Sequence, residues 1–174
     1  MAYRNKTFVS FASEDIRSYR LLQAWKSNQH IDFHFLDAHD INTARDTSNA
    51  ETINRRLTER LSNTKQVLML IGDETRRKAA RQSSFLAHEV RVIDRLNIPV
   101  VFVNTNMSRV ANTHMIPAVL TDRYSMSVPL SPSIVKLALD DFPPRYWDNL
   151  KKSEQQRLRG PYYYESSVYT RLGS

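Results

Sequence analysis

Glu89 is the residue whose type and position best suit it for chemistry. The segment 84–96 has the periodicity of a helix with one apolar face, made up of Phe85, Glu89, Val92, Ile93 and Leu96. A carboxylate on such a face is unusual, because burying an unpaired charge costs free energy. Glu89 is therefore either a flanking acid that reaches water or pairs with Arg81 or Arg91, or a carboxylate held at the mouth of a pocket.

Small polar residues at the end of the expected first strand form a second candidate site. Ser10, Phe11 and Ser13 lie where a strand over 6–11 gives way to a helix over 15–29. The start of a helix presents free backbone N–H groups, which bind anions such as a phosphate. The alternative is purely structural, with Ser13 as the N-cap of the helix.

Histidine and aspartate side chains gather between residues 34 and 40, where a metal site could be sought. They are His34, Asp37, His39 and Asp40. Their spacing matches no standard metal site, so we expect solvated loop residues and no metal. His88 points about a third of a turn away from Glu89 on a helix, and we expect it to be structural or exposed.

The chain is basic, with 25 Lys and Arg residues against 18 Asp and Glu residues and a formal net charge of +7. An excess of positive charge favours anionic partners such as nucleotides, nucleic acid or an acidic protein surface. Two clusters carry much of it: Arg55, Arg56 and Arg60, and then Arg76, Arg77, Lys78 and Arg81. Each is either a solvated face or a contact to a pyrophosphate or a nucleic acid.

The composition excludes several classes of site. The 174 residues include no cysteine, which removes disulfides, thiol nucleophiles and cysteine-bound metals. Three glycines are too few and too dispersed for a P-loop or a dinucleotide-binding G-x-G-x-x-G turn. The longest apolar runs, 67–71 and 98–103, fall far short of the ~20 residues of a membrane-spanning helix. With no recognisable signal peptide, we expect a cytoplasmic protein with no membrane partner.

Short apolar runs alternate with helical patterns over the first ~105 residues, which indicates a parallel α/β sheet with helices on both faces. We expect five strands, near 6–11, 32–36, 66–71 and 98–103, with a short fifth strand within 110–130. A capping-box pattern at 48–51 opens a further helix. Ligands of such sheets bind beyond the carboxyl ends of the strands.

The last third of the chain has a weaker pattern and six prolines after residue 116. We expect a single domain over 1–174, with a core at about 6–140 and an irregular elaboration over 141–174 that begins after a short helix at 134–139. The tail is rich in tyrosine. Tyr162, Tyr163, Tyr164 and Tyr169 should pack mostly against the body, because exposed they would form a large apolar patch.

Several of these motifs resemble a known family. The strand Phe8-Val9-Ser10-Phe11 followed by Ser13-Glu14-Asp15 resembles the opening of a TIR domain, and Phe85-x-x-x-Glu89 resembles the helix motif of catalytic TIR domains, where tryptophan is usual in place of Phe85. Further segments resemble the TIR-like proteins of bacterial Thoeris antiphage systems. These are Leu36-Asp37-Ala38, residues 61–65 and 67–72, Leu158-Arg159-Gly160 and Ser166-Ser167-Val168-Tyr169.

The resemblance implies a flavodoxin-like fold and NAD as substrate, with no permanently bound cofactor. It implies cleavage of the nicotinamide–ribose bond and a cyclic or rearranged ADP-ribose product, which a separate effector senses, with assembly of copies on activation. Glu89 would be the catalytic carboxylate. Phe11 and Phe85 would line the nicotinamide side, Ser10 and Ser13 would meet ribose or phosphate, and Asp37 and Asp40 would form the loop wall.

Three other functions remain open on the sequence. A TIR-like module can act only by protein interaction, without catalysis. A phosphoacceptor receiver-like domain shares the fold, and Asp73 follows a central strand as a phosphoacceptor does, but the first strand ends in Ser10-Phe11 and no lysine follows the strand ending at Val103. Nucleic-acid binding through the arginine clusters is the third.

Overall fold

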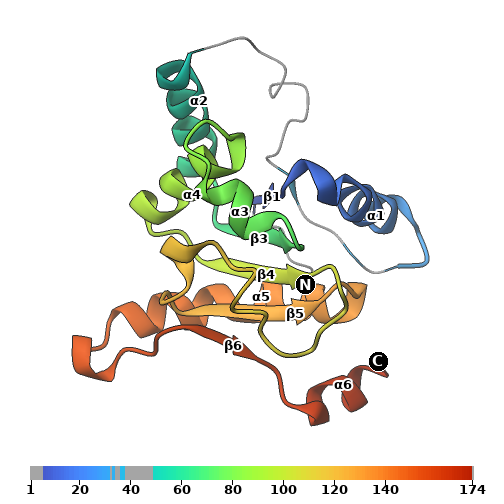
Figure 1. The fold of residues 1–174 in the computed structure, drawn as a ribbon. Coiled ribbons are helices and arrows are strands. Elements are labelled where there is room, and N and C mark those ends of the chain that lie inside the picture. Colours follow the sequence, from blue (N-terminus) through green and yellow to red (C-terminus); the bar gives the residue numbers. More distant parts are fainter. Residues whose placement is uncertain (1–5, 32, 34–35, 38–48, 174) are drawn as a thin grey trace.

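The fold is a six-stranded parallel sheet with helices on both faces (Figure 1). This computed structural model describes residues 6–31, 33, 36–37 and 49–173. The strand order is β2-β1-β3-β4-β5-β6. The strands are β1 (Lys6–Ser10), β2 (Leu36–Asp37), β3 (Gln66–Ile71), β4 (Val100–Asn104), β5 (Ser125–Pro129) and β6 (Pro161–Tyr163).

In the part of the chain that the structure describes, six α-helices connect and follow these strands. They are α1 (Ile16–Ser27), α2 (Ala50–Ser62), α3 (Thr75–Ala80), α4 (Phe85–Leu96), α5 (Pro132–Leu150) and α6 (Ser166–Leu172). The described residues also form the short 3-10 turns η1 (Ser13–Asp15), η3 (Ala118–Leu120) and η4 (Glu154–Gln156). Among the described residues, no helix is both long enough and apolar enough to cross a membrane.

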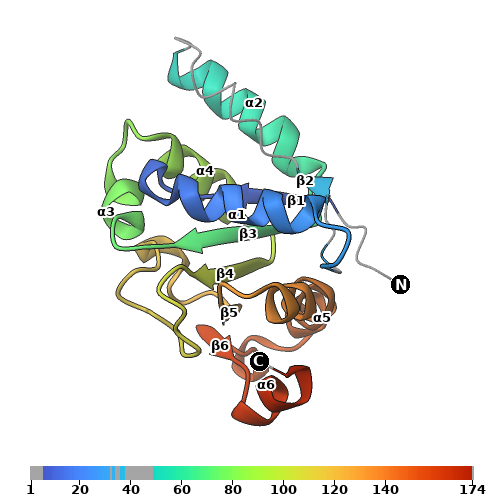
Figure 2. The ribbon, with the colours of Figure 1, turned by 90° about the vertical axis from the view of Figure 1, so that its right-hand side faces the viewer.

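The two faces of the sheet bury separate apolar cores. On one face, alternate residues of β1, β3, β4 and β5 pack against α1, α5 and Tyr169 of α6. On the other face, the intervening strand residues pack against α4, Leu61 at the end of α2 and Leu120 of η3. Figure 2 shows α1 in front of the sheet and α4 behind it. Every residue of β3, β4 and β5 is buried, as expected of central strands covered on both faces.

The fold class predicted from the sequence is confirmed. β1 and β3 lie within the expected ranges 6–11 and 66–71, β4 overlaps 98–103 and ends one residue later, and β5 is the short strand expected within 110–130. β2 overlaps the end of the range 32–36. The cap of α2 is Asn49, one residue after the start of the capping-box pattern at 48–51, and its side-chain oxygen accepts a hydrogen bond from the Thr52 amide. Ser84 caps α4 through the Ala87 amide.

Three features of the fold differ from the sequence-based expectation. The sheet has six strands where five were expected, because residues 161–163 add β6 beside β5. α5 runs over 19 residues through Pro143 and Pro144, well beyond the expected 134–139. Phe142, Pro143 and Tyr146 are buried in α5, so tertiary packing maintains a helix that prolines disfavour. Ser13 was a candidate N-cap, but its side chain caps no helix.

The tail prediction is only partly correct. Tyr169 is 1% exposed and lies in the core, and Tyr164 is half-buried and donates a hydrogen bond to Asp141 at 2.9 Å. Tyr162 and Tyr163 are 42% and 52% exposed, contrary to the prediction. Both lie on β6, the edge strand of the sheet, which pairs with β5 on one side only. The ring of Tyr162 contacts that of Tyr124 edge to face.

Candidate functional site

Glu89 lies on the buried side of α4. The helix begins after the Ser84 cap, and its residues from Leu86 to Val90 are all buried. Leu86, Val90 and Ile93 belong to the apolar core between α4 and the sheet. Glu89 is held among them with only 6% of its surface exposed. Glu89 is therefore not the solvent-exposed flanking acid that the sequence left as one alternative.

Ser10 is the direct partner of Glu89. It is the last residue of β1 and is fully buried. Side chains alternate along a strand, so Ser10 lies on the same face as Phe8, which packs in the core beneath α4. The Ser10 hydroxyl donates a hydrogen bond to Oε2 of Glu89 at 2.5 Å. A small hydroxyl residue at this strand end thus provides both the space for the carboxyl group and a donor to it.

Burial controls the protonation of this carboxyl group. Removal from water raises the pKa of Glu89 to about 8, and the hydrogen bond from Ser10 offsets part of that rise. In the described part of the chain, no basic side chain forms an ion pair with Glu89. The carboxyl group therefore carries a proton in most molecules at neutral pH.

His88 is the neighbour of Glu89 in sequence and joins α4 to α2. It is buried, and its Nδ1 lies 3.0 Å from Oδ1 of Asn54 in α2 and 2.9 Å from the guanidinium of Arg91. The contact with Arg91, which can only donate, needs Nδ1 as an acceptor, whereas the contact with Oδ1 of Asn54 needs an N–H at Nδ1, so the two contacts require different protonation states of that nitrogen. Burial and the charge of Arg91 both lower the pKa of His88. His88 is structural, in agreement with one of the two roles expected for it.

The aromatic binding candidates lie at different places relative to Glu89. Phe85 precedes Glu89 by one turn of α4 and is 40% exposed, so its ring is accessible to a ligand. Phe11 is half-buried and stacks on Tyr19 with ring centroids 4.7 Å apart. It packs against the core on the opposite face of the sheet from Glu89.

The polar binding candidates are less closely associated. Ser13 is exposed; its hydroxyl lies 3.2 Å from a carboxylate oxygen of Glu14 and 3.3 Å from Nζ of Lys78. Asp37 is in β2, paired through its backbone with Thr7 of β1. Asp40 lies outside the described residues, as do His34 and His39. Of the predicted set, the structure brings Ser10 and Glu89 into direct contact.

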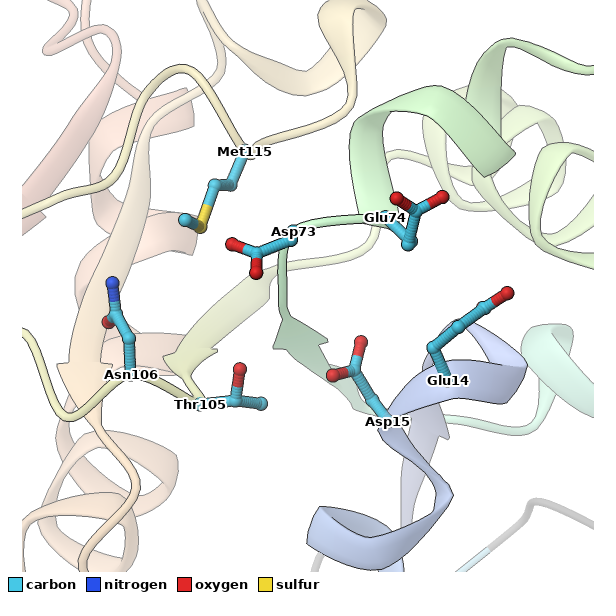
Figure 3. A pocket seen from close by; sticks show the side chains of 7 residues that line it. All are labelled: Glu14, Asp15, Asp73, Glu74, Thr105, Asn106 and Met115. Carbon is cyan, nitrogen blue, oxygen red and sulfur yellow. The ribbon is translucent and has the colours of Figure 1, made fainter.

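An acidic cavity of about 390 Å³ opens at the carboxyl ends of the strands (Figure 3). Its lining comprises Glu14, Asp15, Asp73, Glu74, Thr105, Asn106 and Met115. The acids follow β1 and β3, which are neighbours in the sheet, and Thr105 and Asn106 follow β4. Glu89 is not part of this lining. The sequence did not predict this cavity: Asp73 was considered as a phosphoacceptor, and Glu14 and Asp15 only as part of a motif. The pairs Glu14-Asp15 and Asp73-Glu74, each after a strand, were the signal available.

Asp15 is the most enclosed acid of the cavity. Its carboxylate lies against Gly72, where an added Cβ would be 2.4 Å from Oδ1, and Oδ2 is buried without a hydrogen-bond partner. Burial, together with the charges of Glu14 and Asp73, raises the pKa of Asp15 to about 6. Within the described ranges, no three histidine or acidic residues are arranged to hold a metal ion.

The second basic cluster stabilises the structure around this cavity. Arg77 forms an ion pair with Glu74, and Lys78 pairs with Glu14 at 2.9 Å. Arg76 donates to the backbone carbonyls of Thr113 and Ile116 in the loop after β4. These contacts favour a local structural role over the nucleic-acid contact that the sequence left open.

The cavity brings acids beside Asp73, as a receiver-like domain requires, but its lining contains no lysine.

Part of the chain matches a family of known proteins. Residues 8–109 match the family model described as "Thoeris protein ThsB, TIR-like domain". No curated protein matches the chain. The match runs from β1 to the loop after β4 and includes both Ser10 and Glu89. Residues 110–174, with β5, α5, β6 and α6, lie beyond it.

Proposed function

The chain belongs to the TIR-like family of the Thoeris protein ThsB, and from this premise we propose that it cleaves the nicotinamide–ribose bond of NAD and forms a cyclic or rearranged ADP-ribose signal. Membership implies a role in antiphage defence and signalling to a partner effector. The observation that carries the proposal is Glu89, a buried carboxyl group hydrogen-bonded to Ser10 at the carboxyl end of β1.

The proposed chemistry needs one well-placed carboxylate. The bond between the nicotinamide nitrogen and the ribose C1′ breaks, and its electron pair moves to the nitrogen, so nicotinamide leaves as a neutral molecule without a general acid. Positive charge then spreads over C1′ and the ring oxygen in an oxocarbenium-like transition state. The carboxylate of Glu89 stabilises this charge, and it does so strongly because the site is shielded from water.

The second product forms when a nucleophile attacks C1′. An oxygen or nitrogen of the ADP-ribose portion gives a cyclic or rearranged product, whereas water gives free ADP-ribose. In each case the new bond forms to C1′, and the proton of the nucleophile passes to solvent. Excluding water from C1′ therefore favours the signal over hydrolysis, and the depth at which Glu89 is buried supports such exclusion.

The remaining candidates have supporting roles in the proposal. The Ser10 hydroxyl orients the Glu89 carboxyl group through their hydrogen bond. Phe85 is exposed one turn before Glu89, so its ring can stack on the flat nicotinamide. Phe11 would line the nicotinamide side with Phe85, Ser13 would contact ribose or phosphate, and Asp37 and Asp40 would form the loop wall.

The test compares purified wild type with Glu89→Gln, which keeps the shape of the side chain and removes its charge. Nicotinamide release from NAD and the nucleotide product are measured, with and without an extract of infected cells. We expect Glu89→Gln to lose about 10²-fold or more in rate, as for removal of one electrostatic stabiliser. Glu59→Gln, an exposed acid on α2, is the matched control and should keep full activity.

Two outcomes would contradict the proposal. Equal product from wild type and Glu89→Gln, at equal stability in thermal melts, would remove Glu89 from catalysis. No nicotinamide release from wild type under any condition would favour a non-catalytic module that acts by protein interaction.

A further inference from the structure

The carboxyl group of Glu89 is buried without a positive charge beside it. Its side chain is 6% exposed, and its hydrogen-bond partner is a neutral group, the hydroxyl of Ser10, at 2.5 Å. No Lys, Arg or His of the described residues pairs with it. A lone carboxylate in such surroundings is unfavourable, and the group avoids the cost by holding a proton.

The basic side chains of α4 and α2 described next contact groups other than Glu89. On α4, Arg91 contacts His88 and the carbonyl of Gln82, and Arg95 donates to Thr58 of α2. On α2, Arg56 and Arg60 each have another interaction. None of these cations contributes to the pKa of Glu89, which burial raises and the Ser10 hydrogen bond lowers.

The charged groups of α3 and of the strand ends are likewise engaged elsewhere. Arg77 and Lys78 pair with Glu74 and Glu14, and Arg76 binds backbone carbonyls. Asp15 and Asp73 line the acidic cavity, whose lining does not include Glu89. Among the residues that the structure describes, no cation lies beside Glu89 to keep the carboxylate ionised, and a bound ligand can provide that positive charge.

We propose that Glu89 is uncharged in the resting protein and ionises when the cationic pyridinium ring of an oxidised nicotinamide dinucleotide binds beside it, an inference that rests on the proposed function. On binding, the carboxyl O–H bond breaks, its electron pair stays on Glu89, and the proton passes to solvent. The reduced dinucleotide has a neutral ring, provides no charge and leaves Glu89 protonated. The site thus selects the oxidised form by charge and releases a proton as it binds.

The resting state is tested by infrared difference spectroscopy of wild type minus Glu89→Gln, without ligand. Subtraction cancels every other carboxyl group, including Asp15. We expect the C=O stretch of a protonated acid at pH 7, lost as the pH passes through about 8. A carbocyclic NAD analogue, which keeps the pyridinium charge and cannot be cleaved, should abolish the band at pH 7. Absence of the band from ligand-free protein at pH 7 would overturn the inference.

Proton release is tested by calorimetric titration of the same analogue at pH 7 in two buffers of different ionisation enthalpy. Wild type should release close to one proton per bound analogue, and Glu89→Gln about none. Reduced dinucleotide should bind wild type at least about tenfold more weakly and release no proton. Binding of the oxidised analogue without proton release, or equal affinity for both redox forms, would overturn the inference.

These outcomes separate the inference from the proposed function. A protein that cleaves NAD but shows no protonated Glu89 contradicts the inference alone. A protein that binds the analogue with proton release but never liberates nicotinamide from NAD contradicts the proposed function alone. Failure of wild type to bind the analogue at all contradicts both, because the site then takes no pyridinium ligand.

Discussion

Glu89 and Asp15 are two acids at the same edge of the sheet whose pKa values are both raised by burial, yet their surroundings differ. Glu89 is enclosed by apolar side chains and one hydroxyl, and no other charge contributes to its pKa. Asp15 lines an open cavity with three further acids, and two of these add to the effect of burial.

This difference in surroundings indicates which kind of ligand each site suits. An isolated neutral acid ionises in response to a single cation that approaches it closely, so it suits a ligand whose charge matters in the reaction. A group of acids that share a cavity already has a negative field, so ionisation of one member depends on the others. The predictions below separate these two cases.

The largest effect is expected on the pH dependence of stability in Glu89→Gln. The pKa of Glu89 is about 8 in the folded protein against an ordinary 4.5, so the folded state binds more protons between these pH values. Wild type therefore loses stability as the pH rises through this window, and the loss is complete above about 8. Glu89→Gln lacks that loss and should exceed wild type by on the order of a few kcal/mol at pH 9.

Urea unfolding at pH 5, 7 and 9 measures this difference. The two proteins should be closest at pH 5 and furthest apart at pH 9. Parallel stabilities across the range would show that Glu89 is ionised throughout, like an ordinary surface acid, and the contrast with Asp15 would disappear.

Gly72→Ala tests how tightly the acidic cavity is packed. An added Cβ would lie 2.4 Å from Oδ1 and 2.7 Å from Oδ2 of Asp15. The Asp15 carboxylate must then move, and we expect a loss of about 1–3 kcal/mol in the free energy of unfolding. Removing the Asp15 carboxylate should remove this clash, so the double variant Gly72→Ala/Asp15→Ala should be no less stable than Asp15→Ala alone. Equal losses from Gly72→Ala with and without Asp15 would contradict the contact.

Ser10→Ala tests whether the hydrogen bond from Ser10 contributes to the pKa of Glu89. The hydrogen bond from Ser10 lowers the pKa of Glu89, so its removal should raise that pKa by about 0.5–1, the equivalent of one ordinary hydrogen bond. The infrared band of the protonated acid should then persist to a higher pH. Ser125→Ala, which removes a buried strand hydroxyl without a hydrogen-bond partner, serves as control and should leave the midpoint unchanged.

The smallest effect is expected for Asp15→Asn. The pKa of Asp15 is about 6 against an ordinary 3.8, so its ionisation costs stability as the pH rises through that window. Because the group is partly exposed, the gain in Asp15→Asn above pH 6 should be about 1 kcal/mol or less. Thermal melts at pH 4 and pH 7, with the exposed Asp122→Asn as control, measure it. A gain as large as that of Glu89→Gln would make the two sites equivalent.

The central part of the molecule could be predicted because local pattern and tertiary structure agree there. The apolar runs of β3 and β4 are typical of buried strands, and α4 has both a cap at Ser84 and a consistent apolar face. Glu89 was visible as the polar exception on that face. Its contact with Ser10 depends on the register of β1 against α4, which spacing alone does not determine.

The acidic cavity and the C-terminal third could not be predicted in the same way. The cavity forms because two strands distant in sequence are neighbours in the sheet, so their following acids meet only in the folded chain. In α5, the contacts of Phe142 and Tyr146 with Tyr124 outweigh the local preference of two prolines. Such long-range packing leaves no periodic signal in the sequence.

The strand β6 has a consequence for how copies of this protein can meet in a crowded cell. A sheet edge is a template on which another chain can add a strand, and proteins protect such edges to avoid aggregation. Here the edge strand has only three residues, and the first is Pro161, which has no amide hydrogen to donate. This edge is therefore a poor site for strand addition, and ordered assembly would use another surface of the molecule.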